Sequence, residues 1–387
     1  MSTVRHTSAY PVTAGVRPVP GVTLRWLESV MRINIRTAGA VWILAIALRL
    51  NAASPTPPVR GLHVMAPKPD EMELALRFIR DALPKEGVNT LVMEFDYRYQ
   101  FTRRPEVTDA DPLSKDDVKK IAAACRLAGV RLIPQINCLG HQSWAGTTFG
   151  LLRAHPELDE TPGKYPQNAG IYCRSYCPLH PKVHEIVFDL IDELAEAAGA
   201  DAFHVGMDEI FLLGEDDCER CRGKNKAELF AGEVNALHDR LAQSGRTLWI
   251  WGDRFLDGAT TGMGKWEASM NGTQDAIRMV RKDIVIGDWH YEKALPSVTY
   301  FAMQGFSVVA CPWRKPNVAL GQLAMVRDTR AHATSEIADR MQGVLQTTWV
   351  PFGPFAKAYF GEQAGDTEVH EAVQTFRALF EEVRAVK

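Results

Sequence analysis

Short apolar runs alternate along this chain with longer segments in which apolar residues recur every three or four positions. Residues 248–251 form a continuous apolar run, whereas residues 181–198 carry apolar side chains at helical spacing. The first pattern is typical of a strand buried on both faces, and the second is typical of an amphipathic helix. From residue 59 onward the two patterns alternate eight times.

The pattern therefore predicts eight strands, each followed by a helix. Ser114 and Asp117 form a capping-box pattern at the start of the second helix. The predicted strands cover residues 61–66, 89–95, 131–136, 201–206, 248–251, 284–289, 306–311 and 344–349, and the predicted helices cover residues 70–83, 114–127, 181–198, 224–244, 274–281, 293–304, 318–340 and 368–383.

Strict alternation of strand and helix indicates a parallel sheet, because each helix returns the chain to the same edge of the sheet. Eight such units favour an α/β fold of one domain, a closed (β/α)8 TIM barrel over residues 59–387. An open, doubly wound sheet is the alternative. No Gly-x-Gly-x-x-Gly motif follows the first predicted strand, which argues against a dinucleotide-binding sheet.

Residues 1–58 are predicted to be an N-terminal extension that ends in a Pro-rich linker. Arg32 and Arg36 precede an uncharged apolar run, residues 38–48, and small residues follow that run. This order resembles a secretory signal, and the run is short for a membrane span. We therefore expect export to the periplasm or the extracellular space. A cytoplasmic protein with a peripheral extension is the alternative, and Met31 is an alternative start.

The charge balance limits the classes of partner. The 387-residue chain is 46% hydrophobic and has 44 basic and 47 acidic residues, with a formal net charge of −3. Such a balance favours neither nucleic acid nor an anionic membrane surface as a partner. No stable membrane span is expected, and the composition leaves the oligomeric state open.

Four of the seven cysteines lie in two close pairs, Cys173 with Cys177 and Cys218 with Cys221. Together they have the composition of a four-cysteine zinc site. A disulfide between the pairs is the alternative in an exported protein, and free thiols are the alternative in the cytosol. We expect a structural rather than a catalytic role.

Side chains capable of chemistry collect where the predicted strands end. In a barrel of this kind the catalytic residues lie at the carboxyl ends of the strands. Two adjacent carboxylates, Asp208 and Glu209, directly follow the fourth strand; the other candidates at strand ends are Asp96, His141, Trp251, Asp253, Trp289, Tyr291, Trp313 and Trp349.

Several tryptophans at one rim suggest walls for a flat ligand with a polar edge, such as a sugar ring. Paired carboxylates beside such walls suit glycoside hydrolysis. Asp208 and Glu209 are neighbours in sequence, however, and adjacent residues cannot easily flank one bond from opposite sides. If the protein is a glycosidase, the nucleophile must come from elsewhere, and the substrate itself is one source.

The segment His204-Val205-Gly206-Met207-Asp208-Glu209 resembles the H-x-G-x-D-E signature of glycoside hydrolase family 20, the β-N-acetylhexosaminidases. Residues 131–141, which include Ile133-Pro134-Gln135-Ile136 and Gly140-His141, are similar to the family's I-P-E-I-D-x-P-G-H segment, and Leu213-Gly214-Glu215 resembles its hexosaminidase D-like branch. The resemblance runs from about residue 61 to about residue 354.

The resemblance implies an exo-acting, retaining β-N-acetylhexosaminidase in which the substrate's 2-acetamido group is the nucleophile. It implies that Glu209 is the general acid and base and that Asp208 orients the acetamido group. It also makes His141 a partner of the acid/base, with Asp96 as a third member of that relay. No cofactor and no catalytic metal are implied.

The remaining candidates are predicted to bind the substrate, a glycoside or oligosaccharide with a terminal N-acetylglucosamine or N-acetylgalactosamine. Tyr291 is the candidate for a hydrogen bond to the acetamido oxygen. The walls and polar contacts of the sugar pocket are assigned to Trp251, Asp253, Trp289, Trp313 and Trp349.

Three residues depart from the family pattern: Met207 stands where many members have glycine, and Gln135 and Asn137 replace acidic residues. These changes leave the substrate preference open, so a barrel glycosidase with a different sugar specificity is one alternative. Two other function classes compete with the hydrolase, namely a carbohydrate-binding barrel without activity and a metal-assisted hydrolase. The chain has no H-x-H or H-E-x-x-H motif, which argues against the second.

Overall fold

The computed structural model describes residues 57–362 and 366–385. The predicted signal-like segment, with most of the N-terminal extension, lies outside the described residues. Among the described helices, none has the length and apolar character needed to cross a bilayer.

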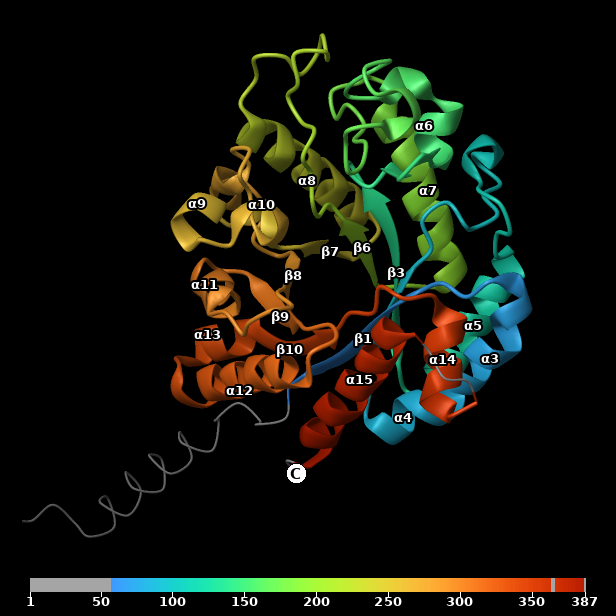
Figure 1. Cartoon of the computed structure of the whole chain (residues 1–387), viewed down its shortest axis with the longest axis vertical. Coiled ribbons are helices and arrows are strands. Elements are labelled where there is room, and N and C mark those ends of the chain that lie inside the picture. Colours follow the sequence, from blue (N-terminus) through green and yellow to red (C-terminus); the bar gives the residue numbers. More distant parts are fainter. Residues whose placement is uncertain (1–56, 363–365, 386–387) are drawn as a thin grey trace, which may run out of the picture. The chain divides into compact units, whose positions relative to one another are not determined.

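Eight parallel strands close into a barrel with helices outside it, which confirms the predicted (β/α)8 fold (Figure 1). Around the barrel the order is β1-β10-β9-β8-β7-β6-β3-β2. The barrel strands are β1 Val59–Met65, β2 Thr90–Glu94, β3 Arg131–Cys138, β6 Ala202–Gly206, β7 Thr247–Trp251, β8 Val285–Trp289, β9 Ser307–Cys311 and β10 Met341–Gln346.

The barrel closes where the first strand pairs with the last. Val59 pairs with Gly343, and Leu62 pairs with Gln346. Gly343 has a φ of +144°, and a Cβ built there would lie 2.0 Å from the carbonyl oxygen of Val59. Only glycine allows the two backbones to approach so closely at this seam.

The helices are α3 Met72–Arg77, α4 Leu83–Glu86, α5 Lys115–Leu127, α6 Gly150–Ala154, α7 Val183–Ala198, α8 Lys226–Gln243, α9 Gly258–Thr261, α10 Gly264–Glu267, α11 Ser297–Met303, α12 Pro316–His332, α13 Ser335–Arg340, α14 Phe352–Phe360 and α15 Thr367–Ala385. The predicted capping box is confirmed, because the Ser114 hydroxyl accepts from the Asp117 amide and the Asp117 carboxylate accepts from the Ser114 amide.

Strict one-to-one alternation was wrong in detail. The predicted helix 318–340 is two helices, because Ala333 is extended and the side chain of Thr334 caps a new helix, α13. The predicted helix 274–281 is a short 3-10 helix, Gln274–Arg278. The last strand begins earlier than predicted, because Met341 already pairs with Val308 of β9, and it ends earlier, at Gln346.

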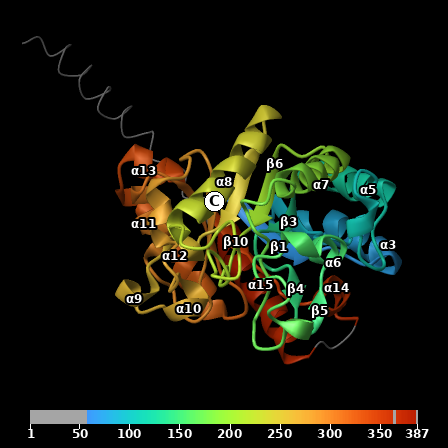
Figure 2. The same cartoon turned by 90° about the horizontal axis from the view of Figure 1, so that it is seen from above.

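The connection from β3 to α7 is long and carries elements that the sequence pattern did not predict. It contains α6 and a two-stranded hairpin, β4 Ser143–Trp144 with β5 Thr147–Thr148. Figure 2 shows the hairpin outside the ring of barrel strands.

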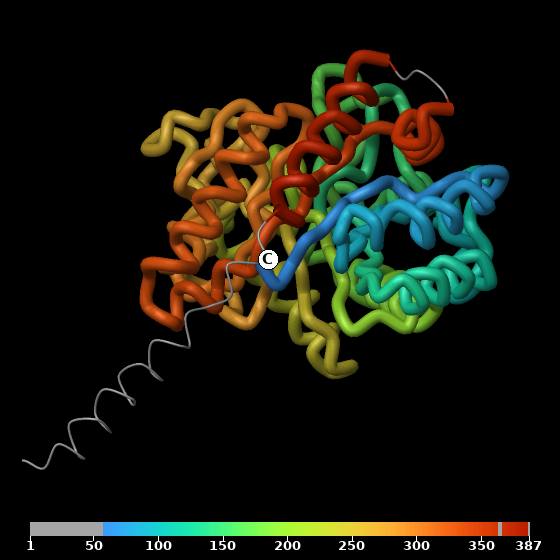
Figure 3. Tube along the Cα trace, turned by 90° about the horizontal axis from the view of Figure 1, so that it is seen from below, coloured from blue at the N-terminus to red at the C-terminus, as the bar shows by residue number. Residues whose placement is uncertain are grey.

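The two ends of the described chain pack against each other on the outside of the barrel. Figure 3 shows the red C-terminal helices beside the blue N-terminal ones. The ring of Phe376 in α15 lies 6.4 Å from that of Phe78, 5.9 Å from that of Phe355 and 5.7 Å from that of Tyr359. This aromatic cluster joins α14 and α15 to the segment that follows α3.

Candidate active site

The backbone turns sharply at the end of β6, where the two adjacent carboxylates lie. Gly206, Met207 and Glu209 all have positive φ angles, of +65°, +67° and +50°. A Cβ on Gly206 would lie 2.2 Å from Oδ1 of Asn137, so the neighbouring strand leaves room for glycine alone. The left-handed backbone conformation of Met207 is one that glycine adopts without strain. A methionine in this conformation is strained, because its Cβ crowds the backbone.

His141 lies between the two carboxylates. Its Nε2 is 3.5 Å from Oδ2 of Asp208 and 3.3 Å from Oε2 of Glu209. Both carboxylate side chains are largely buried, and Oδ1 of Asp208 has no hydrogen-bond partner among the described residues. Burial alone would lower the pKa of His141, but the negative charges of Asp208 and Glu209 outweigh it and raise the pKa well above its usual value. The surroundings of the His141 imidazole therefore favour its positively charged form.

Asp253 fixes the backbone beneath the pair. Its Oδ2 accepts a hydrogen bond from the amide of Glu209 at 2.9 Å and one from Nε of Arg254 at 2.6 Å. The side chain is 2% exposed, and burial raises its pKa to about 6 although Arg254 opposes this. The structure thus gives Asp253 a positioning contact to the acid/base candidate, and its contact with substrate stays a prediction.

Asp96 does not join His141 as the predicted relay requires. Its carboxylate accepts hydrogen bonds from the backbone amide of Asn137 at 2.8 Å and from the Asn137 side chain at 3.2 Å. Burial and the charge of Glu94 raise the pKa of Asp96 to about 7. Asp96 follows β2 with a φ of +47°, and this turn aims its side chain at β3.

The predicted aromatic residues form one connected group at the carboxyl end of the late strands. The rings of Trp251 and Trp349 lie 5.9 Å apart, Trp289 stacks on Tyr291 at 5.0 Å, and Trp313 meets Tyr291 edge-on at 5.4 Å. Nε1 of Trp349 donates to the hydroxyl oxygen of Tyr291 at 2.7 Å. Trp349 lies in the loop after β10 rather than on the strand, yet it reaches this group.

Tyr291 keeps a proton to donate. Its hydroxyl oxygen accepts from Trp349 and, at 3.4 Å, from the hydroxyl of Thr347. Burial raises the pKa of Tyr291 well above its usual value, so the phenol stays protonated. A ligand oxygen at this wall can therefore accept a hydrogen bond from Tyr291.

Sequence reasoning missed a second aromatic group, which lies on the connections between barrel strands. Tyr172 lies edge-on to His141 at 5.8 Å, and its ring contacts those of Trp144, Phe211 and Trp266 at 5.0–5.7 Å. Trp144 is 53% exposed and Trp266 is 44% exposed. Through Tyr172, these exposed tryptophans are linked to His141 by ring contacts. None of these residues follows one of the predicted barrel strands directly, so the sequence pattern did not identify them.

Two groups of side chains have the composition of a metal site. His141, Asp208 and Glu209 bring their ligand atoms within 4.8 Å of one another, and all three belong to the candidate active site. The second group is Glu160, Cys177, Cys218 and Cys221.

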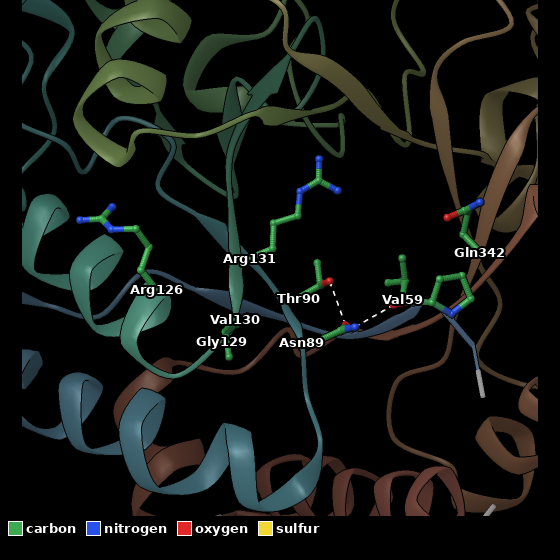
Figure 4. A pocket seen from close by; sticks show the side chains of 9 residues that line it. Val59, Asn89, Thr90, Arg126, Gly129, Val130, Arg131 and Gln342 are labelled. Carbon is green, nitrogen blue, oxygen red and sulfur yellow. Dashed lines mark hydrogen bonds between the residues drawn. The ribbon is translucent and has the colours of Figure 1, made fainter. Parts of the chain in front are cut away.

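A shallow pocket at the opposite end of the barrel contains none of these residues. It is lined by residues at the starts of strands, among them Val59, Thr90, Arg131 and Gln342 (Figure 4). Chemistry in (β/α)8 barrels takes place at the carboxyl ends of the strands, so this pocket is not the candidate active site.

Comparison with known proteins gives one family. The family model described as "Glycosyl hydrolase family 20, catalytic domain" matches residues 91–348. Hexosaminidase D of Homo sapiens is 26% identical over 185 residues, which cover 44% of this chain and 34% of that protein. A beta-hexosaminidase of Emericella nidulans is 28% identical over 128 residues, which cover 27% of this chain and 19% of that protein. The matched part spans about a third or less of these relatives.

Solved structures share the fold. The chitobiase of Flavobacterium johnsoniae superposes with a TM-score of 0.59 at 19% identity and covers 85% of this chain and 52% of its own. An exo beta-N-acetylglucosaminidase of Vibrio harveyi superposes with a TM-score of 0.57 at 16% identity and covers 85% of this chain and 59% of its own. At such identities the likeness concerns the barrel alone.

Proposed function

The chain belongs to glycosyl hydrolase family 20, and on this basis we propose that it is an exo-acting, retaining β-N-acetylhexosaminidase. Its substrate class is a glycoside with a terminal β-linked N-acetylglucosamine or N-acetylgalactosamine. The observation that carries the proposal is the adjacency of Asp208 and Glu209 at the end of β6, with His141 between them.

Adjacent carboxylates suit a reaction in which the substrate supplies the nucleophile. An ordinary retaining glycosidase needs a carboxylate on each side of the scissile bond, about 5–5.5 Å apart across the sugar. Asp208 and Glu209 both approach the site from the end of one strand. One carboxylate then serves the leaving group, and the other serves the 2-acetamido group of the same sugar.

In the first step Glu209, as the protonated carboxylic acid, gives its proton to the glycosidic oxygen while the acetamido oxygen attacks the anomeric carbon, and Glu209 is left as the carboxylate. The bond to the leaving group breaks, and an oxazolinium ring forms. In the second step the Glu209 carboxylate takes a proton from water, which attacks the anomeric carbon and opens the ring. Two inversions at this carbon give net retention.

Asp208 and Tyr291 are the residues we assign to the acetamido group. The unpartnered Oδ1 of Asp208 is an acceptor for the acetamido N–H and stabilises the positive charge that develops on the nitrogen. The hydroxyl of Tyr291 donates to the acetamido oxygen. Trp251, Trp289, Trp313 and Trp349 are proposed as the walls around the methyl group and the sugar face.

The test compares two variants, Glu209→Gln and Asp208→Asn, with the parent on aryl β-glycosides that differ at C2 and C4. We expect kcat/KM on the 2-acetamido sugar to fall by about 10²–10⁴-fold in Glu209→Gln, because the proton donor is lost. For Asp208→Asn we expect kcat/KM on the same sugar to fall by a similar factor. Glu219→Gln is the matched control, since Glu219 is exposed in the same connection and should leave the rate unchanged.

Two outcomes would overturn the proposal. Turnover by folded Glu209→Gln at the parent rate would remove the assigned acid/base, and equal hydrolysis of 2-hydroxy sugars would remove the acetamido nucleophile. Saturable binding of N-acetylglucosamine by the parent, with no hydrolysis of any glycoside in the panel, would instead indicate a carbohydrate-binding barrel without activity.

A further inference from the structure

Four buried side chains from two separate connections converge outside the candidate active site. Glu160 and Cys177 lie between β3 and α7, whereas Cys218 and Cys221 lie between β6 and α8. One carboxylate oxygen and the three sulfurs all lie within 4.8 Å of one another. Cys173 is not part of this group, because its Sγ faces the carbonyl oxygen of Glu209 at 3.9 Å. The predicted four-cysteine group was therefore wrong for Cys173, since Glu160 takes its place beside the other three cysteines.

The sulfurs are close but not bonded. Sγ of Cys177 lies 3.5 Å from that of Cys221 and 3.4 Å from that of Cys218, and all seven cysteines are free. A disulfide requires about 2.05 Å between sulfurs. Three thiolates around a tetrahedral zinc ion at about 2.3 Å from each are about 3.8 Å apart, which is near the observed spacing.

Glu160 is the unusual member of the group. Its side chain is fully buried, and Oε1 accepts hydrogen bonds from the amides of Gly214 at 2.7 Å and Glu215 at 3.1 Å. Oε2 is also buried but has no hydrogen-bond partner, and no ion pair joins Glu160 to a basic side chain among the described residues. A buried carboxylate oxygen without a partner is costly unless a cation binds it.

We propose that Glu160, Cys177, Cys218 and Cys221 bind one structural Zn²⁺ ion in a tetrahedral site. Thiolate ligands favour Zn²⁺ over Mg²⁺ and Ca²⁺, which prefer oxygen. The carboxylate Oε2 completes the four ligands and gains its missing partner. The amides of Gly214 and Glu215 hold Glu160 in position through its other oxygen, as the supporting contacts of metal ligands commonly do.

The site ties together the two connections that carry the catalytic candidates. His141 belongs to the first connection, and Asp208 and Glu209 belong to the second. The amide of Cys177 also donates to the carbonyl oxygen of Leu158 at 2.6 Å. This hydrogen bond joins two parts of the first connection beside the proposed zinc site. Bound zinc would therefore stabilise the loops around the active site without touching substrate.

The test measures zinc in the purified full chain by elemental mass spectrometry after dialysis against metal-free buffer. We expect about one Zn²⁺ per chain, and less than about a tenth of that in Cys218→Ala, because the ion loses a thiolate. Cys125→Ala and Cys173→Ala are the matched controls and should keep the parent zinc content. A strong chelator should lower the Tm of the parent and of both controls but should not change that of Cys218→Ala.

Cobalt substitution of the parent gives a test that does not depend on variants that fold. Co²⁺ in the proposed site should show thiolate-to-metal charge-transfer bands and the d–d bands of tetrahedral coordination. Glu160→Gln should change the d–d bands and keep the charge-transfer bands, because it alters the oxygen ligand alone.

Three results would overturn the proposal: a parent chain without zinc that takes up no Co²⁺, equal zinc in Cys218→Ala and the parent, or a disulfide among Cys177, Cys218 and Cys221 in the purified protein. The intact mass after alkylation under denaturing conditions distinguishes the last result. Because these readouts are metal content, spectra and Tm, they are independent of the hydrolase assignment.

Discussion

At the scale of single residues, the arrangement depends on one imidazole that lies between two carboxyl groups. Asp208 and Glu209 are buried side by side, and their repulsion is offset by His141. The same contact orients the imidazole, so charge compensation and geometry come from one side chain. Asp253 adds the second constraint by holding the Glu209 amide, and neither role is visible in the residue type alone.

His141→Gln should lower kcat/KM by about 10²-fold, because the acid/base loses its oriented partner. It should also change how stability depends on pH. The pKa of His141 is raised in the folded state above the unfolded value of about 6.5. Its contribution to stability is therefore fully present below about pH 6.5 and is lost as the pH rises through the folded pKa.

Urea unfolding of the parent and of His141→Gln at several pH values measures this contribution. The difference in unfolding free energy should be largest near about pH 6 and should shrink in alkaline buffer. His332→Gln, at a histidine whose side chain is 76% exposed, is the control and should change the free energy of unfolding by less than about 0.5 kcal/mol. A constant difference across the pH range would contradict the assigned charge on His141.

At the scale of elements, the end of β6 decides where the carboxylates point. A strand that continued in the extended conformation would carry Asp208 and Glu209 to opposite faces. The left-handed turn at Gly206 and Met207 prevents this, and it fits only because Gly206 lies against Asn137 of β3. The element therefore depends on its neighbour in the barrel as well as on its own sequence.

Gly206→Ala should lower the free energy of unfolding by about 2–5 kcal/mol, which sums the left-handed backbone penalty and the overlap with Asn137. Gly129→Ala is the matched control, since Gly129 has a φ of +68° and open space around it. Gly129→Ala should lower the free energy of unfolding by only the left-handed backbone penalty, about 1–2 kcal/mol. Equal losses in urea unfolding would show that Asn137 does not constrain the turn.

At the scale of the whole barrel, residues distant in sequence close the fold. The seam between β1 and β10 and the aromatic cluster around Phe376 both join the beginning of the described chain to its end. Closing a loop of this length costs conformational entropy, so such contacts form late in folding. Once formed, they make the two ends of the described chain unfold together.

Phe376→Ala should lower the free energy of unfolding by about 3–5 kcal/mol, because the ring is fully buried and a cavity remains. The activity per folded molecule should stay at the parent value, since the cluster lies outside the barrel. Leu127→Ala, at a side chain that is 91% exposed, should change stability by less than about 0.5 kcal/mol. A two-state urea transition followed by circular dichroism and by activity together would check both expectations.

Local patterns were sufficient for the barrel and for most of its elements. A strand buried on both faces is a continuous apolar run, and a helix buried on one face has apolar residues every three or four positions. Both patterns can be recognised within a short stretch of sequence. The predicted bounds were wrong where helix capping or strand register, rather than apolar periodicity, decides where an element begins. Examples are Thr334, which caps a second helix, and Met341, where the last strand begins.

By itself, the sequence determined the parallel barrel, the adjacency of Asp208 and Glu209, and the aromatic residues at the late strand ends, because the carboxyl ends of parallel strands must meet at one rim. The tertiary structure alone decided that His141 bridges the pair, that Asp96 turns to Asn137, and that Glu160 takes the place expected for Cys173. These contacts lie in the connections between elements, where no local period constrains the chain, so their partners are set by how distant loops pack.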